Sequence, residues 1–77
     1  MKLTEAIGQR LKGLLEERKW AYNKLETEGG ISRSTVRKIA EAMHNTVKID
    51  TLYQITQTLD ISLCEFFDDP VFDLVSD

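Results

Sequence analysis

The stretch "GGISRSTVRKIAEAM", residues 29–43, decides the fold that this sequence predicts. Its glycine pair favours the end of one helix, and Ser32 is a good N-cap for the next. The apolar residues that follow predict a helix over residues 32–42 with one buried stripe, formed by Val36, Ile39, Ala40 and Met43. The other side of this helix carries two arginines and a lysine. The pattern alone leaves open whether that side is only solvated or binds another molecule.

Apolar residues at helical spacing predict four more helices, over residues 3–18, 21–28, 50–59 and 63–67. Thr4 is the expected cap of the first helix. The last helix begins with a capping box, because Ser62 precedes Glu65 by three residues. Pro70 is expected to end regular structure. Local helical contacts dominate this pattern, so the predicted fold class is all-α, with five short helices in one compact domain.

The chain is expected to form one domain over residues 1–69, with a helix-turn-helix at about 21–42, and a short tail over residues 70–77. A chain of 77 residues buries only about 60% of the surface of its unfolded state, which leaves little room for a deep active site. The sequence contains no nucleophile–base pair, metal-ligand spacing or phosphate-binding loop. We therefore expect no enzyme activity, and no catalytic residue, metal, cofactor or small-molecule ligand.

The single cysteine, Cys64, excludes an internal disulfide and a cysteine-based zinc site. We expect it to be a core or half-buried side chain, which is compatible with a reducing cytoplasm. No apolar run approaches the roughly 20 residues of a membrane-spanning helix, and the N-terminus lacks the apolar region of a secretory signal. The expected location is cytoplasmic, without membrane association.

Negative charge is concentrated near the C-terminus. The chain has a net charge of −3, which taken alone argues weakly against a nucleic-acid partner. Residues 60–77 hold six of the 13 acidic residues and no Lys or Arg, so residues 1–59 carry ten basic and seven acidic residues, a net charge of +3. A local basic face matters more to a polyanion than the total charge does.

The second and third predicted helices are joined by about three residues, "GGI". Such a short turn containing glycine holds two helices at a steep angle, as in the helix-turn-helix. A helix held crosswise by its neighbour can project from the domain and enter the major groove of DNA, which is about 12 Å wide.

The motifs "IGQRLKGLLEER", "NKLETEGGISRSTVRKI" and "KIDTLYQITQTLDISLCEFFDD" together resemble the Cro/repressor-type (XRE-like) DNA-binding domains of bacteria and their phages. The resemblance covers residues 7–69 and is closest to small stand-alone transcriptional regulators. It implies a compact five-helix, lambda-repressor-like fold whose third helix is the recognition helix, followed here by a short acidic C-terminal tail. It also implies double-stranded DNA as a partner.

The resemblance assigns contacts to particular side chains of the two motif helices. Base contacts are expected from Arg33, Ser34 and Lys38. Phosphate contacts are expected from the ends of the same helices and the loop that follows them, at Ser32, Thr35, Arg37, Tyr22, Asn23 and His44. The chemistry supports these roles, because Arg can bond guanine O6 and N7 together and a helix N-terminus attracts phosphate.

Several positions depart from the family pattern. Ala21 stands where a capping Thr or Ser is usual, and Tyr22 where Gln often contacts the DNA backbone. Glu26 stands where a small alanine is usual, and Ala42 replaces the glycine that follows the third helix. Met43 and Asn45 stand where lysines are frequent. The binding face is therefore less basic than in typical relatives.

The leading hypothesis is a sequence-specific DNA-binding transcriptional regulator, with repression as the expected mode, that acts as a homodimer. The alternative is a protein-interaction module, antitoxin-like or an adaptor, that keeps the fold with weak or no DNA binding. The apolar residues near the C-terminus are the candidate dimer interface: Phe67, Val71, Phe72, Leu74 and Val75. Packing of this tail on its own domain, and disorder, remain open.

Overall fold

The computed structural model describes residues 1–76 and contains no strand in that range. Five α-helices and a final 3-10 turn follow one another: α1 (Leu3–Arg18), α2 (Tyr22–Gly29), α3 (Arg33–Ala40), α4 (Ile49–Thr58), α5 (Leu63–Phe67) and η1 (Pro70–Leu74). The all-α class and the five helices expected from the sequence are confirmed. None of the helices described here is long and apolar enough to cross a membrane.

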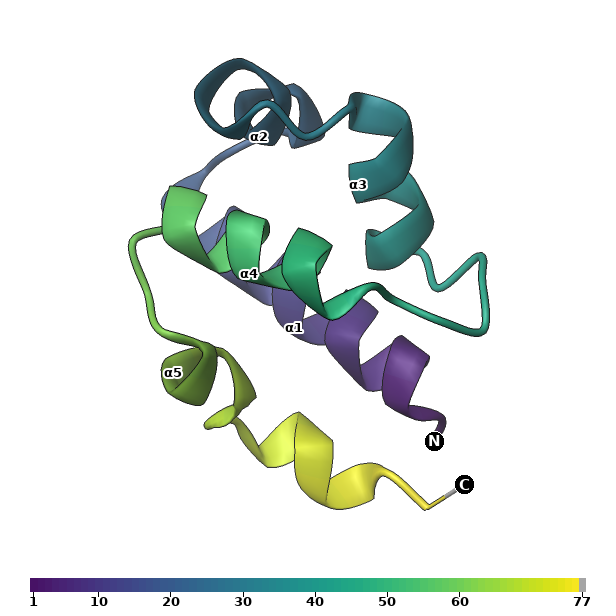
Figure 1. Ribbon diagram of the computed structural model, residues 1–77. Coiled ribbons are helices and arrows are strands. Elements are labelled where there is room, and N and C mark those ends of the chain that lie inside the picture. Colours follow the sequence, from purple (N-terminus) through teal and green to yellow (C-terminus); the bar gives the residue numbers. More distant parts are fainter. Residues whose placement is uncertain (77) are drawn as a thin grey trace.

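The helices surround one apolar core. Helices α1 and α4 overlap in the middle of the view in Figure 1, with α2 and α3 above them and α5 and η1 below them. Every α-helix contributes at least one buried side chain to this core. Phe66 is the largest fully buried side chain, and it lies in the five-residue helix α5. Burial of this single ring therefore attaches the short helix to the rest of the domain.

Two helices approach closely where the end of α3 meets Gly8 of α1. A Cβ atom at Gly8 would lie 2.6 Å from the Ala40 carbonyl oxygen and 2.8 Å from that of Ile39. Only glycine leaves room for these two backbone oxygens. The absence of a side chain at this position therefore fixes how closely α3 packs on the domain.

Arg10 connects α1 to the C-terminal part of the chain. Its Nε and Nη2 atoms donate to the carbonyl oxygens of Phe66 and Glu65, both at 2.8 Å, and its Nη1 lies 3.2 Å from the Asp69 carboxylate. The last carbonyls of a helix lack intrahelical partners. One guanidinium thus satisfies two carbonyls at the end of α5 and also holds the segment that follows.

The segment after Pro70 packs on α1. Asp69 caps η1 by accepting a hydrogen bond from the Val71 amide at 2.9 Å. Phe72 packs against the core, and its ring centroid lies 4.9 Å from that of Phe67. The Ser76 amide also donates to the Met1 carbonyl oxygen at 3.1 Å. All of these contacts are intramolecular, so they attach the C-terminal segment to its own domain.

Four local expectations are wrong. Helix α1 begins one residue before Thr4, with Lys2 as its cap, because the Glu5 carboxylate accepts a hydrogen bond from the Lys2 amide at 2.8 Å. Pro70 starts η1 instead of ending regular structure, since the first helical position needs no amide donor.

Met43 is 56% exposed because α3 ends at Ala40. Cys64 is also exposed, since α5 buries only Phe66.

The two glycines of α1 form a matched pair for mutation. Gly8→Ala should lower the free energy of unfolding by about 1–3 kcal/mol, because the new methyl group overpacks against the α3 backbone. Gly13→Ala should raise it by about 1 kcal/mol, because no atom lies within 4 Å of the added Cβ and alanine favours the helix. Urea unfolding followed by circular dichroism measures both. Equal effects of the two substitutions would contradict the close approach at Gly8.

Candidate nucleic-acid interface

The turn between α2 and α3 is built from two glycines and one buried anchor. Gly30 has a φ of 70° and ends α2 in the left-handed conformation, which glycine adopts without steric cost. Ile31 then enters the core. From α4, Gln54 Nε2 donates to the Gly29 carbonyl oxygen at 2.7 Å. The turn is therefore held by its own backbone, by the core and by a neighbouring helix.

The start of α3 is fixed by side chains on both sides of the turn. Ser32 is its N-cap, as expected: its Oγ accepts a hydrogen bond from the Thr35 amide at 3.1 Å and donates to Thr35 Oγ1 at 2.8 Å. The Glu26 carboxylate accepts a hydrogen bond from the Arg33 amide at 3.3 Å. Glu26 of α2, which departs from the family pattern, therefore acts as a second acceptor at the first turn of α3.

The three side chains expected to contact bases are all exposed on α3: Arg33, Ser34 and Lys38. A surface depression of about 460 Å³ lies between this helix and the start of α2, and it is lined by Tyr22, Arg33, Ser34, Arg37 and Glu41. Within it, Arg37 Nε lies 3.3 Å from Glu41 Oε2. The structure thus brings two predicted base-contact residues together with two residues, Tyr22 and Arg37, expected at phosphates.

The remaining predicted contacts lie on both sides of this depression. Asn23 is exposed in the first turn of α2. A second depression, of about 440 Å³, lies between α3 and the start of α4, and its lining includes Thr35, Lys38, His44 and Lys48. Three of the expected contact residues therefore converge there with Lys48, a lysine that the sequence analysis did not single out. Its place directly before the first turn of α4 is the signal that would have identified it.

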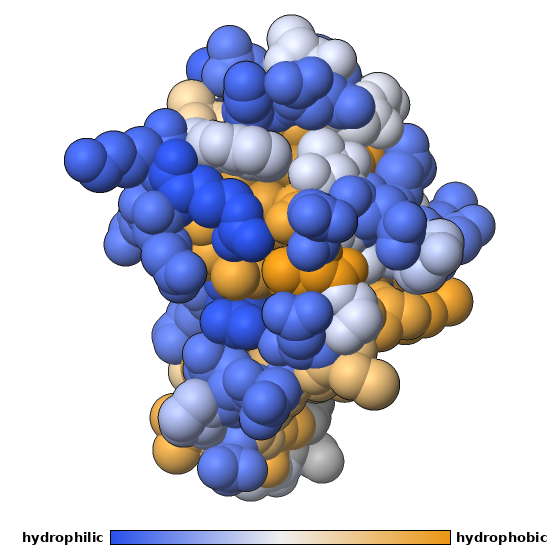
Figure 2. All heavy atoms as spheres, turned by 90° about the vertical axis from the view of Figure 1, so that its left-hand side faces the viewer, coloured by the Kyte–Doolittle hydropathy of each residue, from blue (hydrophilic) through white to orange (hydrophobic). Residues whose placement is uncertain are grey.

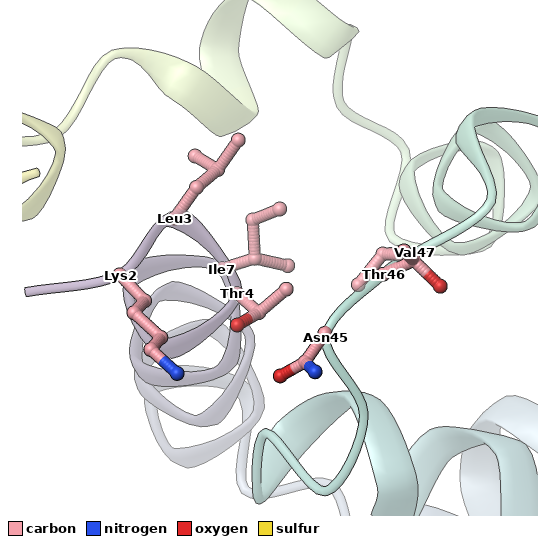
Figure 3. Close-up of a pocket in the computed structure, with 7 residues that line it drawn as sticks. All are labelled: Lys2, Leu3, Thr4, Ile7, Asn45, Thr46 and Val47. Atoms are coloured by element: carbon pink, nitrogen blue, oxygen red, sulfur yellow. The ribbon is translucent and has the colours of Figure 1, made fainter. Parts of the chain in front are cut away.

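A third depression, of about 520 Å³, lies beyond the end of α3 and does not involve its exposed side. Figure 3 shows its lining, in which the start of α1 faces the loop that precedes α4. The residues are Lys2, Leu3, Thr4, Ile7, Asn45, Thr46 and Val47. None of the predicted DNA contacts is among them, although Asn45, Thr46 and Val47 also line the second depression. Residues 1–76 also contain no cluster of three or more metal-ligating side chains.

Two contacts of acidic residues at the interface were not predicted from the sequence. Glu41 stands four residues after Arg37, a spacing that brings helical side chains into contact. Glu26 stands seven residues before Arg33, across the turn, so no helical periodicity connects them. The contact of Glu41 with Arg37 could have been predicted from the sequence. The contact of Glu26 with Arg33 could not, because it depends on the angle between α2 and α3.

The five candidate dimer residues do not share one environment. Val71, Phe72 and Val75 are half-buried, while Phe67 and Leu74 are 37% and 60% exposed. Figure 2 shows the face that contains the connection from α4 to α5, and apolar surface gathers there between hydrophilic side chains. Ile61 belongs to this connection and Leu63 begins α5, and both are half-buried against the core. The apolar surface thus extends beyond the tail itself.

The comparisons with known proteins agree with this geometry. A family model described as helix-turn-helix matches residues 11–66, so the chain belongs to the helix-turn-helix family. It is 29% identical over 62 residues to the HTH-type transcriptional regulator SlrR of Bacillus subtilis (strain 168), a match that covers 80% of this chain. The chain spans 41% of the length of that regulator.

A solved structure shows the same fold. The crystal structure of the prophage Lp1 protein 11 matches with a TM-score of 0.79 and 30% identity, covering 97% of this chain and 100% of that one. Together with the family match, this confirms the resemblance to Cro/repressor-type domains that the sequence motifs indicated.

The end of α3 offers a test of the local backbone. Ala42 has a φ of 51°, a left-handed conformation that is strained for alanine and free for glycine. Ala42→Gly should therefore raise the free energy of unfolding by about 0.5–1 kcal/mol, net of the greater unfolded-state entropy of glycine. Ala40→Gly, in the last turn of α3, is the control and should lower it. A loss of stability in Ala42→Gly, measured by thermal unfolding, would contradict this conformation.

Proposed function

We propose that this protein is a sequence-specific DNA-binding transcriptional regulator that inserts α3 into the major groove and acts as a homodimer. The observation that carries this proposal is the exposed side of α3, where Arg33, Ser34 and Lys38 project from a helix that the core, Gly8 and the glycine turn hold in place. Arg33 provides the fork that matches guanine, and Lys38 and Ser34 can donate to base acceptors one turn apart.

Backbone contacts complete the proposed complex. Tyr22 and Asn23 lie at the start of α2, where helix amides attract phosphate. Ser32, Thr35 and His44 border the recognition side of α3 and would contact phosphates beside the groove. Such contacts fix the register of the protein on the duplex, while the base contacts select the sequence.

The distribution of charge supports this orientation. Four of the acidic residues near the C-terminus lie in α5, in η1 or between them, at the end of the molecule opposite α2 and α3 (Figure 1): Glu65, Asp68, Asp69 and Asp73. These carboxylates would therefore face away from the duplex. Separation of charge in this way reconciles a net charge of −3 with a polyanionic partner, since screened interactions fall off within about 8–10 Å.

A homodimer would read two half-sites about one helical turn apart. The candidate interface is the apolar surface at the C-terminal end, with the exposed Phe67 and Leu74 and the half-buried Val71, Phe72 and Val75. Such a dimer would occupy its site and exclude other proteins from it, so repression is the regulatory mode we propose. The proposed location is the cytoplasm.

The second candidate is a protein-interaction module that keeps the fold without the DNA role. The observation that favours it is the presence of Glu26 and Glu41 on the side of the molecule that would meet DNA. The two candidates differ in salt dependence. Neutralising several phosphates makes the affinity for a duplex fall steeply with salt, whereas an apolar protein contact is much less sensitive.

Selection of duplexes from a randomised library on the purified full chain, at near-physiological salt, tests the leading proposal. An enriched motif with two-fold symmetry is expected. One asymmetric half-site would retain recognition by α3 and remove the dimer. A folded chain that enriches no sequence would instead favour the protein-interaction module, and a search for protein partners would follow.

Arg33 can then be tested on the selected duplex. Arg33→Ala should reduce discrimination against a changed guanine by about tenfold or more, because one bidentate pair contributes roughly 1–3 kcal/mol. Arg33→Lys is the matched control: it keeps the charge but lacks the planar fork, so it should retain affinity for a scrambled duplex and still lose discrimination. Fluorescence anisotropy measures both dissociation constants. Full discrimination in Arg33→Lys would contradict a bidentate base contact.

A further inference from the structure

We propose that Glu41 is a positioning residue for DNA recognition, which holds Arg37 through its Nε atom and leaves the two terminal nitrogens free to read a guanine. This inference rests on the proposed function and changes the role that the sequence analysis gave to Arg37. Arg37 Nε lies 3.3 Å from Glu41 Oε2, with both side chains on the exposed side at the end of α3. The same depression contains Arg33, the leading candidate for base contact.

The atom used in the ion pair matters. A guanidinium has five donors, and an ion pair made at Nε leaves the edge formed by Nη1 and Nη2 available. Among residues 1–76, the ion pair of Arg37 with Glu41 is made at Nε. A bidentate contact to guanine O6 and N7 requires two such donors in one plane. The Nη1–Nη2 edge of Arg37 is therefore available for a base, while its Nε atom is paired with Glu41.

Holding the side chain affects discrimination more than affinity. A free arginine loses rotamer freedom when it binds a base, and a guanidinium already held by a carboxylate loses less. Arg37 lies in the last turn of α3 and Glu41, four residues later, is its C-cap, so the end of the helix fixes the distance between their backbones. The pair therefore presents the Arg37 fork in a defined direction before DNA arrives.

The charge of the pair argues against a simple phosphate contact. Glu41 largely cancels the positive charge of Arg37, and a neutral pair gains little from the phosphate backbone, which attracts free cations most strongly. The Glu41 carboxylate also repels nearby phosphates. On a non-specific sequence, no base contact of Arg37 compensates for this repulsion. Glu41 should thus lower non-specific affinity and raise the ratio of specific to non-specific affinity.

A second exposed ion pair provides the control. Lys24 Nζ lies 3.2 Å from Glu28 Oε1 on α2, with the same four-residue spacing and similar exposure, 42% and 54%, compared with 64% and 43% for Arg37 and Glu41. Exposed pairs of this kind contribute little to stability. Glu28→Ala therefore matches Glu41→Ala in charge and in its spacing from a cation, but lies outside the depression that holds Arg33.

The test uses two substitutions at position 41 in the full chain. Glu41→Ala removes both the charge and the acceptor, whereas Glu41→Gln removes the charge and keeps a side-chain oxygen that can accept a hydrogen bond from the guanidinium. Dissociation constants are measured for the selected duplex and for a scrambled duplex. Glu41→Ala should lower the ratio of the two affinities by about tenfold, the effect of losing one well-positioned base contact. Glu41→Gln should retain most of the ratio.

Two further variants show whether Glu41 acts through Arg37. Glu28→Ala should leave the ratio unchanged, and Glu41→Ala should no longer lower it when Arg37 is already alanine. Equal gains of affinity for both duplexes in Glu41→Ala and Glu41→Gln would mean that Glu41 only repels DNA, which overturns the proposal. An unchanged ratio in Glu41→Ala overturns it as well. A wild-type chain that binds no duplex overturns both this inference and the proposed function. Thermal unfolding of each variant verifies that the domain remains folded.

Discussion

The close packing of α3 on α1 at Gly8 is the constraint on which the orientation of the exposed helix depends. The carbonyl oxygens of Ile39 and Ala40 occupy the space that a side chain at position 8 would fill. At the other end, the glycine turn and the Ser32 cap fix where α3 begins. A helix of only eight residues is marginal by itself in water, so both ends need external support. With both ends fixed, its exposed side chains keep one direction relative to the domain.

The lower half of the molecule depends on a different interaction. Helix α5 has five residues, too few to be stable alone, and Phe66 is its one fully buried side chain. Arg10 completes its attachment by donating to the carbonyl oxygens at its end and pairing with Asp69. Because the guanidinium is only partly exposed, these hydrogen bonds are worth more than those of a solvated pair. Arg10 of α1 thus holds the segment that follows α5, with its acidic residues, at the end of the molecule away from α3.

The sequence predicted best what is encoded within a few neighbouring residues. The Ser32 cap, the Ser62–Glu65 capping box and the buried Val36 and Ile39 each follow from spacings of three or four, and the structure contains all of them. Arg10 was not identified, because its partners Glu65 and Phe66 lie 55 and 56 positions away and no local pattern links them. The contact between Glu26 and Arg33 was missed for the same reason, since it depends on the angle between two helices. Met43 was assigned to the buried stripe because periodicity alone cannot show that Ala42 leaves the helical conformation.

Two carboxylates, Glu26 and Glu41, form a consistent picture at the two ends of α3. Glu26 bonds the amide of Arg33 at the beginning, where the helix dipole favours a negative charge. Glu41 pairs with Arg37 at the other end, where the dipole favours a cation and would disfavour an unpaired carboxylate. Each carboxylate thus has a local partner and lowers the net positive charge of the surface without breaking the helix. A binding face organised in this way would depend less on general attraction to phosphates and more on the fit of a few oriented donors. Reduced basicity is therefore compatible with selective recognition, because selectivity follows from the difference between specific and non-specific affinity and not from the total attraction.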